Sequence, residues 1–164
     1  MTEVLRAGVL AGVRVAVVPV GSSPLCAAVR DRLTALGAEV ADRPSVLVVD
    51  ASGAPEPRAA LDGAWDVVQP WAEAAIPAAA GGQLVLLAPP PGDALAEAAR
   101  AGLENLSRTL SVEWARHAIR PVTLLPGTGT SPAEVAELVG FVASPAGAYY
   151  AGCAFTLGSA AAGA

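Results

Sequence analysis

One stretch of this chain, from Ala94 to Gly127, constrains its fold more than any other. Apolar residues there recur every three or four positions, the period of a helix that buries one face. They are Ala99, Leu103, Leu106, Leu110 and Trp114. The pattern then changes to the short apolar run 122–125 (VTLL), typical of a strand covered on both faces, and Pro126-Gly127 ends it. We therefore predict a long helix over 94–117 that leads into a buried parallel strand.

The rest of the chain alternates strand-like and helix-like segments. In chain order these are a strand at 14–19, a helix from 22–24 to Gly37, a short strand at 38–41, a strand at 45–50, a helix at 59–79 broken or kinked at Pro70, a strand at 83–87, a helix at 134–143 and a last strand within 144–159. Such alternation predicts an α/β chain with a reduced Rossmann-like three-layer fold, in which a parallel sheet of five or six strands has helices on both faces. We expect one domain over 1–164, with a frayed Ala/Gly tail within 155–164.

Composition limits what such a domain can bind. Of the 164 residues, 54% are hydrophobic and only 15% charged, so we expect another subunit to cover part of the surface. The net charge of −5, without a cluster of arginines, argues against a nucleic-acid partner. We also expect no membrane partner and a cytoplasmic location, because no apolar run is long enough to span a bilayer and the start MTEVLRAGVL lacks a basic leader region. Cys26 and Cys153 are predicted to be small buried side chains, and nothing has metal-ligand spacing.

The segment 103–127 (LENLSRTLSVEWARHAIRPVTLLPG) resembles the active-site helix and following strand of the short-chain dehydrogenase/reductase (SDR) family, Rossmann-fold oxidoreductases that use NAD(P). The resemblance places that family's catalytic Asn, Ser, Tyr and Lys on residues that cannot replace them, namely Ala60, Ala88 (or Pro89), Ala96 and Arg100. We therefore expect no catalytic residue of this kind. Arg100 is expected to be a solvated helix residue paired with Glu97 or Glu104.

The turn after the first strand is where the resemblance would place the glycine-rich cofactor loop. Its glycine positions hold Val20, Pro24 and Cys26. Pro24 has no N–H for a phosphate, and the other two put side chains where only hydrogen fits. The degenerate loop is thus predicted to bind no dinucleotide, although the amides of 21–23 could still hold a small anion. Its residues are Val20, Gly21, Ser22, Ser23, Pro24 and Cys26. We expect NAD(P) only in a partner subunit.

Other polar and aromatic residues could have either a functional role or a structural role in a turn or in packing. Asp50 could be a ribose ligand or general base, but its place at a strand end favours a residue that starts a turn. Trp65 and Trp71 could form a platform for a cofactor or sugar, and packing is the favoured interpretation. Tyr149 and Tyr150 could be acids, but their position before the last strand again favours packing.

In the family that this chain resembles, the helices matching 59–79 and 94–117 and the last strand form subunit interfaces. The resemblance therefore implies an interface formed by Trp65, Trp71, Leu103, Leu106, Leu110 and Phe155. We expect a non-catalytic SDR-like subunit that assembles with an active NAD(P)-dependent SDR paralogue as a heterodimer or heterotetramer, in an oxidoreductase complex of alcohol/ketone or 3-hydroxyacyl type. The alternatives are an atypical NAD(P)-dependent oxidoreductase with altered cofactor binding, and a homodimeric module that holds another small ligand, such as an acyl or CoA-type group.

Overall fold

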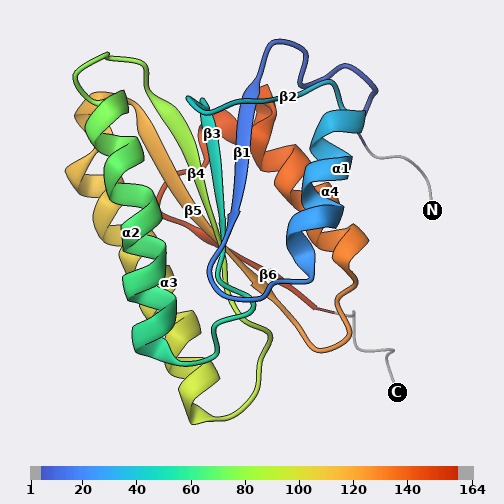
Figure 1. Ribbon diagram of the computed structural model, residues 1–164, viewed down its shortest axis with the longest axis vertical. Coiled ribbons are helices and arrows are strands. Elements are labelled where there is room, and N and C mark those ends of the chain that lie inside the picture. The colour runs from blue at the N-terminus through green and yellow to red at the C-terminus, as the bar shows by residue number, and fades with distance from the viewer. Residues whose placement is uncertain (1–4, 159–164) are drawn as a thin grey trace.

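The computed structural model describes residues 5–158, and they form a six-stranded, wholly parallel sheet between two layers of helices (Figure 1). The strand order is β2-β1-β3-β4-β5-β6, which confirms the predicted three-layer Rossmann-like fold. The elements are β1 (Arg14–Pro19), α1 (Leu25–Ala35), β2 (Glu39–Val40), β3 (Val46–Asp50), α2 (Pro57–Ala75), β4 (Gly82–Leu87), α3 (Ala94–Glu113), the 3-10 turn η1 (Ala115–His117), β5 (Ile119–Pro126), α4 (Pro132–Ala143), the 3-10 turn η2 (Pro145–Tyr149) and β6 (Ala154–Leu157).

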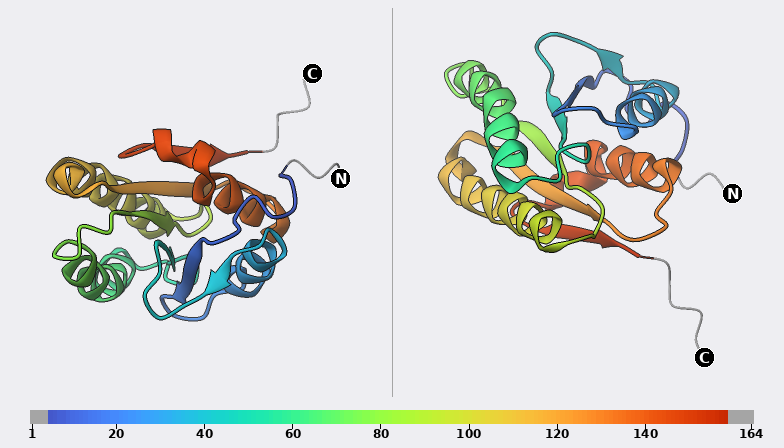
Figure 2. Two further views of the ribbon diagram at one scale, coloured as in Figure 1. Left: turned by 90° about the horizontal axis from the view of Figure 1, so that it is seen from above. Right: turned by 60° about the horizontal axis from the view of Figure 1, so that its bottom comes forward.

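Helices α1 and α4 cover one face of the sheet, and α2 and α3 cover the other (Figure 2). Every residue of β3 is buried because this strand has helices above and below it. Its side chains alternate between two cores: Val48 packs with the α1–α4 layer, while Leu47 and Val49 pack with the α2–α3 layer. The alternation of a strand thus joins both helical layers through one sheet.

The order of the strands defines where a ligand site is expected. From β1 the chain crosses to β2 at one edge, then returns to β3 on the other side of β1. In open α/β sheets, ligands bind at the carboxyl ends of the two strands where the winding direction reverses. Here those strands are β1 and β3, so the turns at 20–24 and 51–54 flank the expected site.

Two predicted helices differ from the structure. The helix from Ala94 ends at Glu113 rather than at 117, and Ala118 adopts a left-handed conformation (φ 54°) that turns the chain into β5. Helix α2 runs from Pro57 to Ala75 rather than over 59–79, and it is continuous through Pro70, where a kink or a break was predicted. Proline removes an N–H from the helix interior, but Pro70 and Asp66, the residue that loses its N–H partner, are both exposed, so water can hydrate the free carbonyl.

The predicted frayed tail falls mostly on residues 159–164, which lie outside the described part of the chain. Within residues 5–158, no helix is both long and apolar enough to cross a membrane.

Candidate functional site

At the expected ligand site, the turn after β1 lies directly on the turn after β3. A side chain on Gly53 would place its Cβ 2.0 Å from the carbonyl oxygen of Ser22, so only glycine allows this contact. A Cβ on Gly21, whose φ is +75°, would lie 3.3 Å from the carbonyl oxygen of Gly53. The two turns therefore meet backbone to backbone. The crevice in which a doubly wound fold holds a pyrophosphate is closed at this point.

Beneath the two turns, the carboxylate of Asp50 is fully buried at the end of β3. The Ser52 N–H donates to Asp50 Oδ1 at 3.0 Å, which confirms that Asp50 starts a turn. The Ser23 hydroxyl donates to Asp50 Oδ2, and the Cys26 thiol lies 3.4 Å from the same oxygen. Leu25, the first residue of α1, donates its N–H to Ser23 Oγ at 3.1 Å. The sequence pointed to Asp50 but did not predict its partners Ser23 and Cys26, because these residues follow a different strand.

Burial next to Asp50 changes the chemistry of the Cys26 thiol. Burial, reinforced by the nearby Asp50 carboxylate, raises the pKa of the Cys26 thiol to about 11. Cys26 is therefore a neutral thiol at physiological pH and not a thiolate nucleophile.

The dinucleotide implied by this type of fold does not fit these residues. Pro24 offers no N–H, and Leu25 already donates its N–H to Ser23. A phosphate placed at the turn would also face the negative charge of Asp50, and so would the small anion that the sequence allowed at 21–23. At the place where a ligand would bind, the polar groups of the two turns are therefore bonded to other groups of the same chain.

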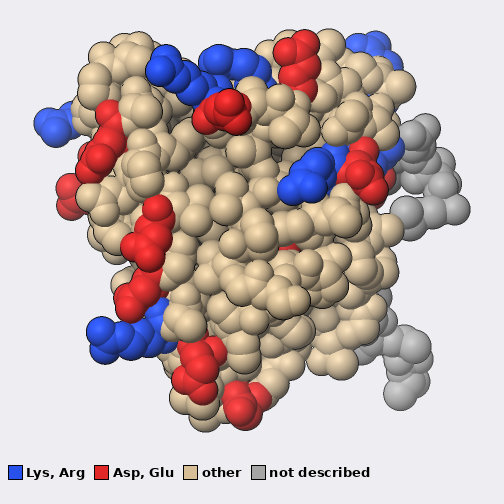
Figure 3. All heavy atoms as spheres, in the orientation of Figure 1, with Lys and Arg blue, Asp and Glu red and all other residues tan. Residues whose placement is uncertain are grey.

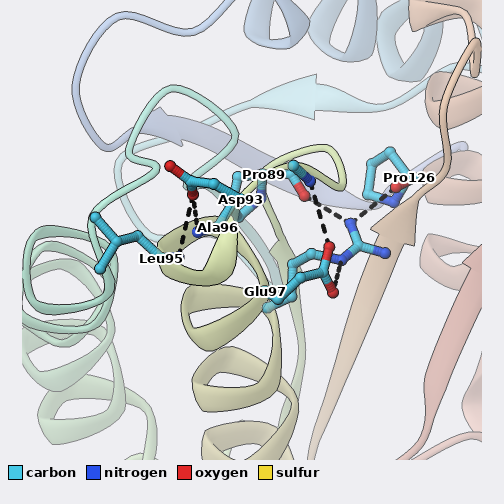
Figure 4. A network of polar contacts seen from close by, with 8 residues as sticks. Pro89, Asp93, Leu95, Ala96, Glu97 and Pro126 are labelled. Carbon is cyan, nitrogen blue, oxygen red and sulfur yellow. Dashed lines mark hydrogen bonds and ion pairs between the residues drawn. The ribbon is translucent and has the colours of Figure 1, made fainter.

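Arg100 fills a second part of the same edge of the sheet. Its Nη1 donates to the carbonyl oxygens of Pro89, at 2.6 Å, and Pro126, at 2.8 Å (Figure 4). These carbonyls lie just after β4 and at the end of β5, so one guanidinium ties two strand ends together. The helix that carries it is capped by Asp93, whose carboxylate accepts the N–H groups of Leu95 and Ala96.

The expectation that Arg100 is solvated is wrong, because the residue is buried. Its predicted partner Glu97 is confirmed, with Glu97 Oε2 at 3.6 Å from Arg100 Nε, while Glu104 pairs with Arg108 instead. A signal for burial was present in the sequence: Arg100 shares a helical face with Ala96 and Leu103, which are also buried.

The other three positions that the resemblance singled out are also buried. Ala60, Ala88 and Ala96 are all buried methyl groups, and the first two belong to the core between the sheet and the α2–α3 layer.

The tryptophans pack, as expected. Trp71 donates its Nε1–H to the carbonyl oxygen of Pro44 at 2.9 Å and packs against the core. Trp65 stacks on Trp114, with ring centroids 6.5 Å apart, and keeps 39% of its surface exposed. One edge of the Trp71 ring is thus hydrogen-bonded, and one face of the Trp65 ring is covered.

The two tyrosines behave differently from each other. Tyr150 packs between Phe141 and Phe155, with centroid separations of 5.8 and 5.1 Å, which confirms the prediction of packing. Tyr149 is 90% exposed, so the prediction of packing was wrong for this residue. It ends the η2 turn on the side that faces solvent.

Two residues of the predicted interface are not at the surface. Leu103 and Leu110 are buried in the core beneath α3, so the apolar stripe read from the sequence faces the sheet. Trp65, Trp71, Leu106 and Phe155 retain exposed surface.

A groove that the sequence did not predict lies beside α2. It encloses about 910 Å³, and its lining includes Ala16 and Val18 of β1 together with Val67 and Trp71 of α2. On this face of β1 the side chains are only half-buried, because α2 and α3 pack over β3 and its neighbours. Few charged side chains lie over the centre of the surface between α2 and α1, and most lie near its rim (Figure 3).

Comparison with known proteins gives the fold its context. No family model and no curated protein matches this sequence. Among solved structures, the chain is similar to a citronellol catabolism dehydrogenase (AtuB) of Pseudomonas aeruginosa PAO1, with a TM-score of 0.71 and 20% identity over 96% of this chain and 98% of that chain. It is also similar to BdcA (YjgI) from E. coli, with a TM-score of 0.71 and 20% identity over 92% of this chain and all of that chain (100%).

These comparisons overturn the membership in the short-chain dehydrogenase/reductase family that 103–127 suggested. No family model matches, and neither solved structure is described by that family's name. At 20% identity the likeness shows the fold alone. The local resemblance reflects a helix and strand with the burial periods that any covered parallel sheet requires.

Proposed function

We propose that this chain is a non-catalytic subunit that assembles with an active dehydrogenase of similar fold through the outer surface of α2 and α3. The observation that carries this proposal is the closed ligand crevice, where Gly53 lies on Ser22 and Asp50 is bonded by the chain's own Ser23. With the two turns in contact, the outer surface of the helices is the part of the molecule from which we argue the function.

The helical layer offers the features of an interface. Val112 is 77% exposed and Trp65 39% exposed, and both lie on this layer. Exposed ion pairs lie on the same helices, Arg58–Asp62 on α2 and Glu104–Arg108 on α3. Aromatic and aliphatic anchors with charged neighbours are typical of protein interfaces.

The choice of partner rests on the fold. AtuB, described as a citronellol catabolism dehydrogenase, shares the architecture over 96% of this chain. A catalytic chain of that architecture would present a helical layer of similar dimensions, and two such layers can pack against each other as helix pairs do. In this proposal the partner chain binds the substrate and carries out the reaction.

The test is native mass spectrometry of the tagged chain isolated from its own host. We expect a heteromer that contains a second chain with NAD(P)-dependent dehydrogenase activity. Val112→Asp should disrupt it, because a charge would be buried without a partner. Val40→Asp is the matched control, since Val40 is 62% exposed but lies on the edge strand β2, away from the helical layer.

Three results would contradict the proposal. The first is a preparation that never contains a second chain, and the second is a heteromer disrupted equally by both substitutions. The third is saturable binding of NADH or NADPH to the isolated chain at micromolar concentration, which would favour an oxidoreductase with an altered cofactor site.

A further inference from the structure

Strand β6 lies at one edge of the sheet and pairs only with β5 (Figure 2). Thr123 of β5 is opposite Ala154 in the register and donates its N–H to the carbonyl oxygen of Cys153 at 3.1 Å. Successive residues of a strand direct their N–H and C=O groups to opposite sides. Phe155 therefore directs its groups toward β5, while Ala154 and Thr156 direct theirs away from it. No strand of the described chain pairs with these outward N–H and C=O groups.

The opposite edge of the sheet is protected. Strand β2 has only two residues, and beyond it β1 becomes the edge. There the carbonyl oxygen of Val17 accepts a hydrogen bond from Arg30 Nη2 at 3.3 Å, and Pro19 has no N–H to offer. Charged side chains and prolines at an edge prevent further strands from adding to a sheet. Strand β6, whose sequence is AFTL, contains neither, so its edge is open to another strand.

The free backbone groups of β6 are arranged symmetrically about Phe155, with Ala154 on one side and Thr156 on the other. A two-fold axis at Phe155 would bring Ala154 of each copy opposite Thr156 of the other. Each of these two pairs would exchange two hydrogen bonds, so all the outward groups of both strands would be satisfied.

The side chain of Phe155 suits the centre of such a pairing. The two Phe155 residues would form a non-hydrogen-bonded pair, the kind in which opposite side chains approach most closely. Phe155 is half-buried, so part of its surface is free for this contact. Its ring packs edge-on against Tyr150, with centroids 5.1 Å apart, which restricts its orientation.

We infer that β6 binds a second copy of this chain by antiparallel strand pairing. The occupant is a second copy because one two-fold axis satisfies the free groups of both edges and requires no other sequence. Since the opposite edge is protected, association stops at two copies. The contact is a strand edge and not the outer surface of α2 and α3, so it is independent of the proposed heteromer.

The test is sedimentation velocity of the isolated full chain at about 5 to 500 µM. We expect a monomer–dimer equilibrium with a Kd of about 10 µM and no larger species. Hydrogen exchange followed by NMR locates the contact. The amides of Ala154 and Thr156 should exchange several-fold more slowly at about 500 µM than at about 20 µM, because dimerisation buries them. The amide of Val40, which faces outward on β2, should exchange at the same rate at both concentrations.

Proline substitutions make the result specific to one edge. Thr156→Pro removes an outward N–H but none of the hydrogen bonds to β5, so it should raise the Kd at least about tenfold. Val40→Pro is the matched control, since it removes the outward N–H of the other edge strand and should leave the Kd unchanged. Thr156→Ala keeps the N–H and should dimerise as the parent does. Circular dichroism checks that each variant is folded, and if Thr156→Pro does not fold, hydrogen exchange of the parent decides.

Three results would overturn this inference. One is a chain that stays monomeric up to about 500 µM, whether or not it forms a heteromer in its host. Another is a folded Thr156→Pro variant that dimerises as the parent does. The last is a dimer in which the amides of Ala154 and Thr156 gain no protection, since the copies would then meet through another surface.

Discussion

The hydroxyl of Ser23 donates a hydrogen bond to the buried carboxylate of Asp50, and so joins the turn after β1 to the end of β3. These are the two strands between which a doubly wound sheet normally holds its ligand. A phosphate at this edge of the sheet would need N–H and hydroxyl donors. Here those donors are already bonded to acceptors of the chain itself. This contact predicts how substitutions here will affect stability.

Replacing Asp50 with Ala should lower the free energy of unfolding by about 3 kcal/mol, because the partly buried donors of Ser23 and Ser52 lose their acceptor. Asp50→Asn should cost less, since its amide oxygen still accepts. Urea denaturation followed by tryptophan fluorescence measures both. A loss under about 1 kcal/mol in Asp50→Ala would mean that the network does not stabilise the fold.

Replacing Gly53 with Ala should lower the free energy of unfolding by about 2 kcal/mol or more, because the new Cβ would overlap the Ser22 carbonyl and force the two turns apart. Gly158→Ala is the control, since a Cβ there meets nothing within 4 Å. Thermal unfolding by circular dichroism compares them. Equal melting temperatures for the two variants would contradict the close contact of the turns.

Arg100→Ala should destabilise the chain by about 2 to 3 kcal/mol, because the carbonyls of Pro89 and Pro126 lose a charged donor. Arg100→Lys should recover part of this loss, since an ammonium can reach one carbonyl but lacks the planar fork. Arg108→Ala, which breaks an exposed pair with Glu104, should cost at most about 0.5 kcal/mol. Chemical denaturation provides the three values, and a similar cost for both alanine variants would contradict the buried role of Arg100.

The raised pKa of Cys26 predicts that the stability of the fold depends on pH in the alkaline range. Its pKa is raised from 9.0 to about 11 in the folded chain, chiefly by burial. Between these values the unfolded chain binds fewer protons than the folded one, so stability is retained below pH 9.0 and falls as the pH rises toward about 11. Unfolding curves of Cys26→Ala should show a smaller fall than the parent over this range. An identical fall would show that Cys26 does not hold its proton more tightly when folded.

Much of the architecture followed from local pattern. The valine-rich segments of β1 and β3 and the three-to-four spacing in α3 predicted their elements, because a strand or helix must bury its apolar residues with its own period. Boundaries failed where the backbone changed direction without a sequence signal, as at Ala118, a residue that rarely adopts a positive φ.

The candidate site was harder to predict, since hydrogen bonds between distant segments do not follow a period. The sequence by itself determined the α/β class, the absence of a glycine-rich loop, and the alanines at the positions of the resemblance. Only the tertiary structure decided that Asp50 meets Ser23, that Gly53 lies on Ser22, and that Arg100 is buried between two strand ends. The reason is physical: burial periods act within one element, whereas a closed crevice depends on how two turns meet once the sheet has assembled.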